Sequence, residues 1–398
     1  MRSLPLDLDA LLAPMSSDEF FTSHCSKLFC HVSGTPEKFA ALLPWADLNR
    51  ILELHTLRPS QLELVKSGMP VDPRSYTEYR TREGWVVPRV KVKEFTNQLR
   101  EGATLVLSHI HEMYLPLMVL AESIERRFRA PSGINIYAAW REIHGFGVHR
   151  DKHDVFIAQV SGRKQWRLYG STAATESKPP REHVWEDVLK PGDLLYIPRG
   201  WWHAAAPLNE PSLHLSISVE NPTISEVLTW AASELRTDDL GYVNVSVMTT
   251  AKERAELLEK AKQTVLTMFD ADLIEKYFDQ SDLKRETLPR FSLPWSATPE
   301  AFPVDGSTLV RLRIRRTVKL RMDPTNHFFE FTLHGQKWRF PAIMKVFLDA
   351  TRDGQTLSID ELISLGRNSP GEAMSRAFIT TLVKEGILTA VRSDREPR

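Results

Sequence analysis

Short apolar runs in the middle of this chain are separated by Gly, Pro, Asp and Ser, and longer helical patterns lie on either side of them. Runs of this kind, bounded by turn residues, are typical of compact antiparallel β structure. The runs between residues 131 and 221 are Ile134–Ala139, Val155–Val160, Gln165–Leu168, Leu194–Ile197 and His214–Glu220. We therefore predict a β sandwich or barrel in this part of the chain.

The flanking segments have mainly helical patterns. Residues 1–130 read mostly as helix and loop, with a helix over Leu115–Arg129 and a strand over Gly102–Leu107. Residues 222–290 contain two long amphipathic stretches without Gly or Pro, Ile224–Leu235 and Ala251–Met268. Their apolar faces could pack on the β core or against a second copy of the chain, and the pattern leaves both open.

The last hundred residues predict a separate domain after a Pro- and Ser-rich linker over Pro294–Pro303. Val310–Met322 alternates apolar and basic residues, which predicts a strand whose basic face is solvated. Further elements follow at Phe328–Leu333 (strand), Ala342–Ala350, Ile359–Leu365 and Ala373–Glu385 (helices), and Gly386–Val391 (strand). Three helices followed by a strand favour a winged helix. Its candidate recognition helix has few basic residues, which argues against a nucleic-acid partner.

Composition narrows the class of protein. Lys and Arg number 51 in the 398 residues, as do Asp and Glu, so the formal net charge is zero and no overall attraction to nucleic acid or membrane is expected. Two cysteines, Cys25 and Cys30, exclude a disulfide framework and suit a reducing compartment. The N-terminus lacks a signal-peptide pattern, and no apolar run reaches the ~20 residues of a membrane span. We expect a soluble, cytoplasmic protein.

One set of residues has the spacing of a metal site. His149 and Asp151 are two positions apart, so on a strand their side chains share a face. His203 follows the bend at Pro198-Arg199-Gly200, where a returning strand could bring it beside them. Two histidines and one carboxylate form a facial triad, which leaves positions open for a chelating oxo-acid and for O2. Nitrogen and oxygen ligands without thiolate suit Fe(II).

Other interpretations of the histidines are weaker. His149-Arg150-Asp151 also imitates a kinase catalytic loop, but Val155-Phe156-Ile157 stands where that loop needs Asn, and no Gly-rich phosphate loop precedes it. On a strand, His153 would share a face with His149 and Asp151, yet we expect it to be a spare polar residue near the pocket and not a fourth ligand. The remaining histidines of interest are expected to be structural or superficial: His109, His111, His144 and His214.

Several short motifs occur together here: His149-x-Asp151, Asp154-Val155-Phe156, Gly162-Arg163-Lys164-x-Trp166 and the segment from Pro191-Gly192-Asp193 to Gly200-Trp201-x-His203. In this combination the chain resembles the JmjC/cupin-4 ribosomal oxygenases. The resemblance implies an α+β fold with a double-stranded β-helix (jelly-roll/cupin, JmjC) core and N-terminal helices. It further implies a catalytic domain over 1–221 (core 131–221), a helical dimerisation domain over 222–293 and a winged-helix domain over 304–398.

The same resemblance implies a co-substrate site and an activity. Lys164 matches the basic residue that binds the distal carboxylate of 2-oxoglutarate, while Asn135, Tyr137 and Ser216 fall near the co-substrate. With Fe(II), 2-oxoglutarate and O2, a homodimer would hydroxylate a protein or peptide, in first place an arginine or histidine residue of a ribosomal protein. Three alternatives stay open: a hydroxylase of a peptide natural product, a non-oxygenase metal cupin, and a nucleic-acid-binding regulator.

Overall fold

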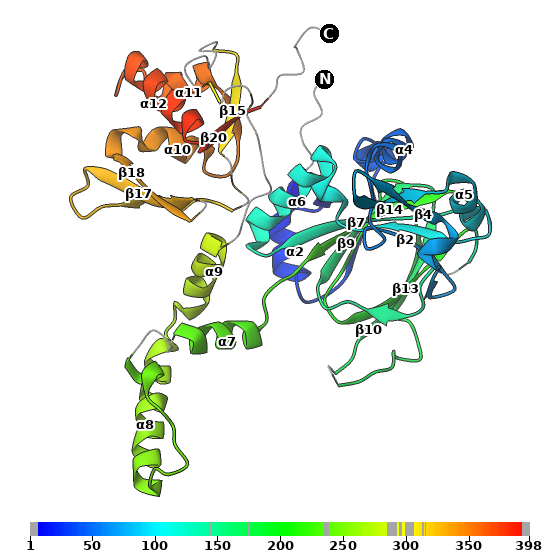
Figure 1. The fold of residues 1–398 in the computed structure, drawn as a ribbon, viewed down its shortest axis with the longest axis horizontal. Helices are drawn as coiled ribbons and strands as arrows, with labels where there is room; N and C mark the ends of the chain where they lie inside the picture. Colours follow the sequence, from blue (N-terminus) through cyan, green and yellow to red (C-terminus); the bar gives the residue numbers. More distant parts are fainter. Residues whose placement is uncertain are drawn as a thin grey trace. The chain divides into compact units, whose positions relative to one another are not determined.

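The chain forms two compact units, Met1–Asn221 and Pro222–Arg398, here called the N-terminal and C-terminal units (Figure 1). This computed structural model describes residues 7–143, 145–173, 175–234, 239–284, 293, 297–298, 306–312, 314, 316–333 and 335–391. The predicted linker, Pro294–Pro303, lies almost entirely outside the described residues, as do His144, Arg313 and Arg315.

Two antiparallel sheets build the N-terminal unit. The larger is eight-stranded, in the order β1 (Cys30–Val32), β12 (Leu194–Ile197), β9 (Asp154–Ser161), β14 (Ser212–Val219), β7 (Ser132–Ala139), β6 (Thr104–Leu107), β2 (Leu62–Lys66) and β3 (Met69–Pro70). The smaller is four-stranded, in the order β11 (Trp185–Leu189), β10 (Lys164–Ser171), β13 (Trp201–Pro207) and β8 (His149–Arg150). The segment from 132 to 219 contributes strands to both sheets, as in a double-stranded β-helix.

Strand β9 of the large sheet is buried on both of its faces. Alternate residues of β9, such as Phe156 and Ala158, belong to a core shared with the helices of this unit. The residues between them, Val155 and Ile157, pack against Leu168 of the smaller sheet in a second core. Because a strand covered on both sides gains from apolar residues at every position, β9 reads as a continuous apolar run.

The helices of the N-terminal unit cover the outer face of the large sheet. They are α1 (Leu8–Leu12), α2 (Ser17–Ser23), α3 (Glu37–Ala40), α4 (Trp45–Leu54), α5 (Val92–Arg100) and α6 (Leu115–Phe128). The expected N-cap of α2 is present, since the Ser16 hydroxyl accepts a hydrogen bond from the Glu19 backbone amide at 3.1 Å. The helix expected over Leu115–Arg129 is α6.

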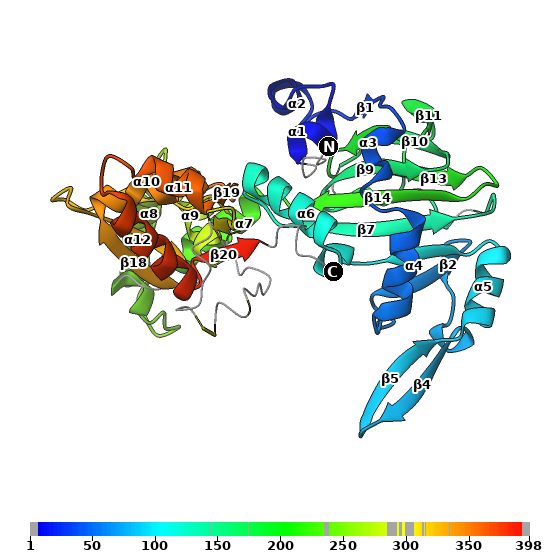
Figure 2. The ribbon, with the colours of Figure 1, turned by 90° about the horizontal axis from the view of Figure 1, so that it is seen from above.

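The N-terminal segment contains more strands than its pattern predicts. β1, β2 and β3 all join the large sheet, although residues 1–130 read mostly as helix and loop. These strands are two to five residues long, too short for a period to be recognised. A separate hairpin of β4 (Thr77–Arg82) and β5 (Trp85–Val90) extends beyond the rest of this unit in Figure 2.

The C-terminal unit begins with three helices, α7 (Ile224–Glu234), α8 (Ala251–Met268) and α9 (Leu273–Lys284). A capping box of Thr250 and Glu253 fixes the start of α8. Only a small core joins α7 to α9, through Val227, Ala231 and Leu273. Among the described residues, no helix combines the length and the apolar character that crossing a bilayer requires.

In the described part of the chain after α9, two three-stranded sheets combine with three α-helices. One sheet has the order β19 (Thr356–Ser358), β15 (Leu309–Leu312), β20 (Leu388–Val391), and the other β16 (Arg321–Met322), β17 (Phe328–Leu333), β18 (Gln336–Pro341). The helices are α10 (Lys345–Thr351), α11 (Ile359–Leu365) and α12 (Glu372–Lys384). The three helices and the last strand expected from the sequence are all present.

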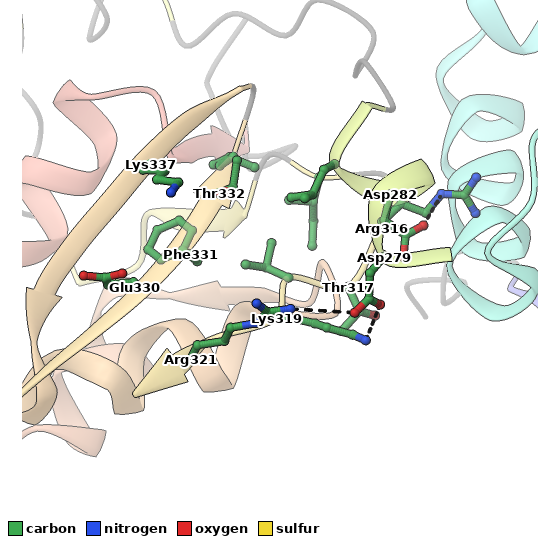
Figure 3. Close-up of a pocket in the computed structure, with 14 residues that line it drawn as sticks. Asp279, Asp282, Arg316, Thr317, Lys319, Arg321, Glu330, Phe331, Thr332 and Lys337 are labelled. Carbon is green, nitrogen blue, oxygen red and sulfur yellow. Dashed lines mark hydrogen bonds and ion pairs between the residues drawn. The ribbon is translucent and has the colours of Figure 1, made fainter. Parts of the chain in front are cut away.

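The basic stripe of Val310–Met322 differs from its prediction. The described residues between Leu312 and Arg321 are not part of a strand. Arg316 is buried with its Nε 3.5 Å from Asp282 of α9, and both Lys319 and Arg321 pair with Asp279 (Figure 3). These basic groups line a cavity of about 230 Å³ beside α9; Arg316 is buried there, whereas Lys319 and Arg321 remain exposed as expected.

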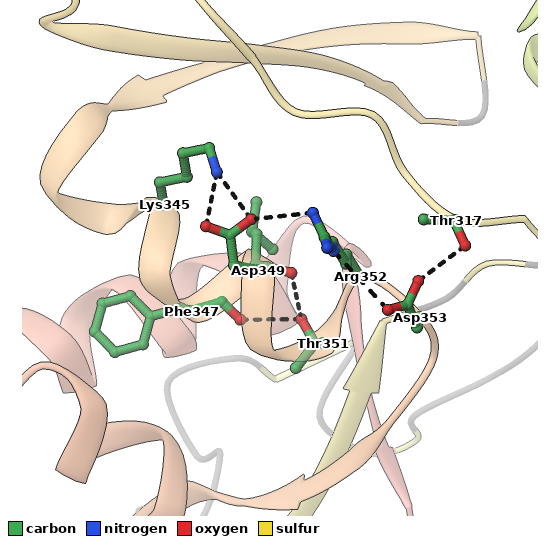
Figure 4. Close-up of polar contacts among 8 residues, drawn as sticks. Thr317, Lys345, Phe347, Asp349, Thr351, Arg352 and Asp353 are labelled. Carbon is green, nitrogen blue, oxygen red and sulfur yellow. Dashed lines mark hydrogen bonds and ion pairs between the residues drawn. The ribbon is translucent and has the colours of Figure 1, made fainter.

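A second group of polar contacts anchors the segment that carries this stripe. The Thr317 hydroxyl donates to the Asp353 carboxylate at 2.9 Å, just beyond the end of α10 (Figure 4). Within α10, Asp349 pairs with Lys345 at 2.7 Å and with Arg352 at 3.8 Å. The segment between β15 and β16 is thus held at both α9 and α10.

Candidate metal centre and co-substrate cleft

The three predicted ligands meet at one point of the smaller sheet. β8 carries His149, Asp151 follows it directly, and β13 places His203 opposite His149. One ligand atom from each residue lies within 4.8 Å of the others. The two imidazole centroids are 4.4 Å apart, and His203 Nε2 is 3.6 Å from Asp151 Oδ2. A single ion of ordinary radius could contact all three side chains.

Both imidazoles have the tautomer that a metal ligand needs. His149 Nδ1 lies 2.9 Å from the Gly147 carbonyl, and His203 Nδ1 lies 3.0 Å from the Trp201 carbonyl. Because a carbonyl oxygen only accepts, each Nδ1 must carry the hydrogen, and each Nε2 keeps its lone pair. Burial, and next the neighbouring His149, lower the pKa of His203 to about 4, which keeps its ring in the neutral, ligating form.

The described residues contain a second group of side chains of metal-ligating types, but its buried histidine lacks the tautomer that an ion requires. His109, His111 and Glu112 also lie close together. The buried His111, however, accepts a hydrogen bond at Nδ1 from the Ile134 backbone amide at 3.2 Å. Its hydrogen must then sit on Nε2, so the neutral ring has no lone pair left for an ion. His111 is thus a structural histidine, as the sequence predicts.

Hydrogen bonds from the tight bend before β13 connect the two ligand-bearing segments. The Gly200 amide donates to the Asp151 carbonyl at 3.0 Å, and the Arg199 amide donates to the buried Asp154 carboxylate at 2.7 Å. Gly200 has a φ of +79°, a conformation that a residue with a Cβ rarely adopts. The Pro-x-Gly-Trp motif therefore serves to set His203 against Asp151.

Arg150, between the two ligands, holds the short strand β8 from its other side. Its guanidinium donates to the Thr172 hydroxyl at 3.1 Å, the Ala173 carbonyl at 3.2 Å and the Glu176 carbonyl at 2.8 Å. It also lies over the Trp202 ring, 5.0 Å from the centroid. Sequence reasoning did not single out this residue, although strand parity places it opposite to the ligands.

Lys164 is on the inward face of β10, as predicted. Its side chain is buried, with 4% of its surface exposed, and burial alone lowers its pKa to about 7. Its Nζ lies 3.4 Å from Nδ1 of His214, a residue of β14 that is 3% exposed. Trp166, two positions along β10, contacts both His214 and His203 at ring-centroid distances of 5.4 and 6.2 Å. Lys164, His214, Trp166 and the ligand His203 therefore form one group of side chains between the two sheets, here called the cleft.

The other predicted co-substrate residues share this cleft. Across the pair β7–β14, Asn135 faces Ser216 and Tyr137 faces His214. The Tyr137 and His214 rings are stacked, 5.1 Å apart and 5° from parallel. Burial, and next the charge of Asp151, raise the pKa of Tyr137 to about 12, so its phenol stays protonated at neutral pH. Asn135 Oδ1 accepts a hydrogen bond from the His109 amide at 3.0 Å.

His214, expected to be a structural or superficial histidine, is buried beside Lys164. Its position next to Lys164 was not foreseen, although His214 has the same strand parity as Ser216, which was assigned to the co-substrate site. His153 lies outside the three-residue ligand group.

Comparison with known proteins identifies the domain that contains this site. Residues 110–227 match the family model described as the JmjC domain. This chain contains a JmjC domain. The eight- and four-stranded sheets around His149, Asp151 and His203 are therefore a JmjC/cupin fold, as the motifs of this segment predict.

This chain is also similar to longer eukaryotic proteins. It is 31% identical over 230 residues to the bifunctional lysine-specific demethylase and histidyl-hydroxylase NO66 of Drosophila willistoni, covering 53% of this chain and 28% of the relative. It is 26% identical over 300 residues to ribosomal oxygenase 1 of Gallus gallus, covering 68% of this chain and 49% of that protein. The chain thus spans half or less of the length of these curated relatives.

Among solved structures, the chain is similar to the Escherichia coli ribosomal oxygenase YcfD. The TM-score is 0.60 at 17% sequence identity, and the match covers 95% of this chain and 98% of YcfD. YcfD has also been solved with cobalt and 2-oxoglutarate, and that structure matches with a TM-score of 0.59. At this identity the likeness establishes the shared fold.

Proposed function

We propose that this chain is an Fe(II)- and 2-oxoglutarate-dependent hydroxylase of a protein or peptide. The observation that carries the proposal is the group of His149, Asp151 and His203, in which both imidazoles keep the lone pair of Nε2 and His203 Nε2 lies 3.6 Å from the carboxylate. Three ligands of these types leave half of an octahedral ion open, which suits a chelating co-substrate and O2.

The residues of the cleft fit such a co-substrate. When bound, iron would supply the oxidative chemistry that couples decarboxylation of 2-oxoglutarate to insertion of one oxygen atom into a C–H bond. Lys164 would pair with the distal carboxylate, which would give its buried side chain a counter-charge. Asn135, Tyr137 and Ser216 would line the space between that carboxylate and the metal.

For the substrate, we propose an arginine or histidine residue of a ribosomal protein. The support is the similarity to proteins named as ribosomal oxygenases and histidyl-hydroxylases. An enzyme with such a substrate would act in the cytoplasm. Mass spectrometry of ribosomal proteins from cells with and without this chain tests the proposal. We expect one peptide to differ by the mass of one oxygen atom, and unchanged ribosomal proteins would contradict this choice of substrate.

We further propose a homodimer formed through residues 222–293 and a winged-helix domain over 304–398. Apolar side chains along and before α8 are largely exposed: Val247 by 93%, Met248 by 88%, Leu258 by 69% and Leu266 by 57%. Exposed apolar residues at such density favour a protein interface. For the winged helix, the support is the succession of α10, α11 and α12 beside the sheet of β15, β19 and β20.

A further inference from the structure

Two buried basic side chains face each other in the cleft without an acidic neighbour acting on either. Lys164 Nζ and His214 Nδ1 are 3.4 Å apart, and each residue is less than 5% exposed. Burial is the only cause that shifts the pKa of Lys164, and burial followed by Lys164 itself lowers the pKa of His214 well below its usual value. A carboxylate close to either group would act in the opposite direction.

The contact itself determines which group carries the proton. A lysine ammonium only donates, so His214 Nδ1 must accept when Lys164 is charged, and the imidazole must then be neutral. The ring is fixed for this role on two sides. Tyr137 stacks on one face at 5.1 Å, and the Trp166 ring meets it edge-on at 5.4 Å. An imidazole held in this way offers its lone pair in one direction.

The other strands around this pair contribute groups that do not change charge near neutral pH. β7 presents Asn135 and the protonated phenol of Tyr137, and β14 presents Ser216 beside His214. β9 places Gln159 next to His214, and β13 places Pro207 next to Lys164. The titrating group of this part of the cleft is therefore Lys164, and its immediate hydrogen-bonding partner is His214.

We propose that His214 is a positioning residue for the co-substrate: its neutral imidazole orients the Lys164 side chain and favours the protonated amine that the distal carboxylate of a 2-oxo dicarboxylate requires. This inference rests on the proposed function of the cleft. Binding of the dicarboxylate takes up one proton from solvent whenever Lys164 is neutral in the free protein. The proton leaves a buffer or water molecule and forms an N–H bond on Lys164; no other covalent bond changes.

Two consequences distinguish this role from simple packing. Above pH 7 the affinity for 2-oxoglutarate falls about tenfold per pH unit, because each molecule bound must bring one proton to Lys164. Without the acceptor at position 214 the amine is harder to protonate, so the fall begins at a lower pH. A residue that only fills space would instead change the affinity by the same factor at every pH.

The test is calorimetric titration of the Mn(II)-loaded protein with 2-oxoglutarate under argon, from pH 6 to pH 9. His214→Phe keeps a ring for Tyr137 to stack on and removes the acceptor, whereas His214→Gln retains an acceptor oxygen. Lys164→Met serves as the control without a titrating amine. Repeating the titration in buffers of different ionisation enthalpy counts the protons taken up.

For the wild type we expect uptake approaching one proton at pH 8. We expect His214→Phe to bind about tenfold more weakly than wild type at pH 8 and within threefold of it at pH 6, a shift of about one pH unit. His214→Gln should follow the wild-type profile. A wild-type profile that His214→Phe leaves unchanged, or weakens equally at every pH, would overturn this role for His214 alone. Absence of 2-oxoglutarate binding by the wild type at any pH would instead remove the proposed function, and this inference with it.

Discussion

At the scale of single residues, the two ligand histidines and Lys164 differ in how their polar groups are satisfied. His149 and His203 satisfy Nδ1 with backbone carbonyls, so their remaining nitrogens are prepared for an ion. Lys164 has only another basic group as its hydrogen-bonding partner. Its amine is therefore costly to the folded protein until an anion arrives.

Replacing Lys164 should stabilise the ligand-free protein while it removes the group proposed to bind 2-oxoglutarate. Lys164→Met removes a buried amine whose pKa is depressed to about 7, so we expect the ligand-free protein to melt about 4 °C or more higher at pH 7. Because the unfolded chain binds the lysine proton up to about pH 10.4, the gain should be full at pH 7 and below and should vanish as the pH approaches that value.

Melting temperatures of wild type and variant between pH 6.5 and 9.5 check this expectation. Lys152→Met is the matched control, since Lys152 is exposed and close in sequence to the ligands. It should leave the melting temperature unchanged across the range. A Lys164→Met variant that is less stable than wild type at pH 7 would show that the amine has a stabilising partner.

At the scale of elements, the two-residue strand β8 is the weakest part of the site. It lies at the edge of the smaller sheet, and among the described strands it pairs with β13 alone. The contacts of Arg150 to residues 172–176 supply the other support. We expect Arg150→Ala to weaken Fe(II) or Mn(II) binding by about 10- to 100-fold, because the orientation of His149 and Asp151 depends on it.

Metal titration followed by calorimetry measures this effect directly. Arg167→Ala is the control, because Arg167 lies on the neighbouring strand β10 and pairs with Glu186 at 2.8 Å, away from the ligands. Its affinity should stay within threefold of wild type. Equal losses in the two variants would mean that Arg150 acts only through general stability.

Elements determined by local pattern could be predicted from the sequence, and those determined by distant partners could not. β9, β10 and β12 have buried or alternating runs bounded by turns, and strand parity placed His149 and Asp151 together. β1 exists because it pairs with the remote strand β12, and β3 is itself only two residues long, too short for a pattern. Arg316 is buried because Asp282 approaches from another element, which periodicity within residues 310–322 cannot reveal.

The cleft shows the same division. Lys164 was found through the resemblance of its motif, and Asn135, Tyr137 and Ser216 through shared parity on two strands. His214 was missed because a histidine on a mostly apolar strand is ordinarily a structural residue. Its partnership with Lys164 depends on how the two sheets meet, at a separation of 50 positions along the chain.

At the scale of the whole molecule, the proposed dimer can be tested on α8. Leu258 is 69% exposed, and a charge at this position would be buried in a dimer interface without a partner. We expect Leu258→Glu to convert a dimer into monomers in size-exclusion chromatography with light scattering. Gln263→Glu adds the same charge about 140° around the helix and should remain dimeric. A monomeric wild type at micromolar concentration would contradict the proposal.

The central claim is that His149, Asp151 and His203 hold the iron of a 2-oxoglutarate oxygenase. The most direct measurement is succinate formed from 2-oxoglutarate by the purified chain with Fe(II) and O2 in the absence of a protein substrate. We predict slow uncoupled turnover by the wild type and none above the iron-only background for His149→Ala, with a circular dichroism spectrum like that of wild type. Equal succinate formation by wild type and His149→Ala, or none by either, would contradict the account.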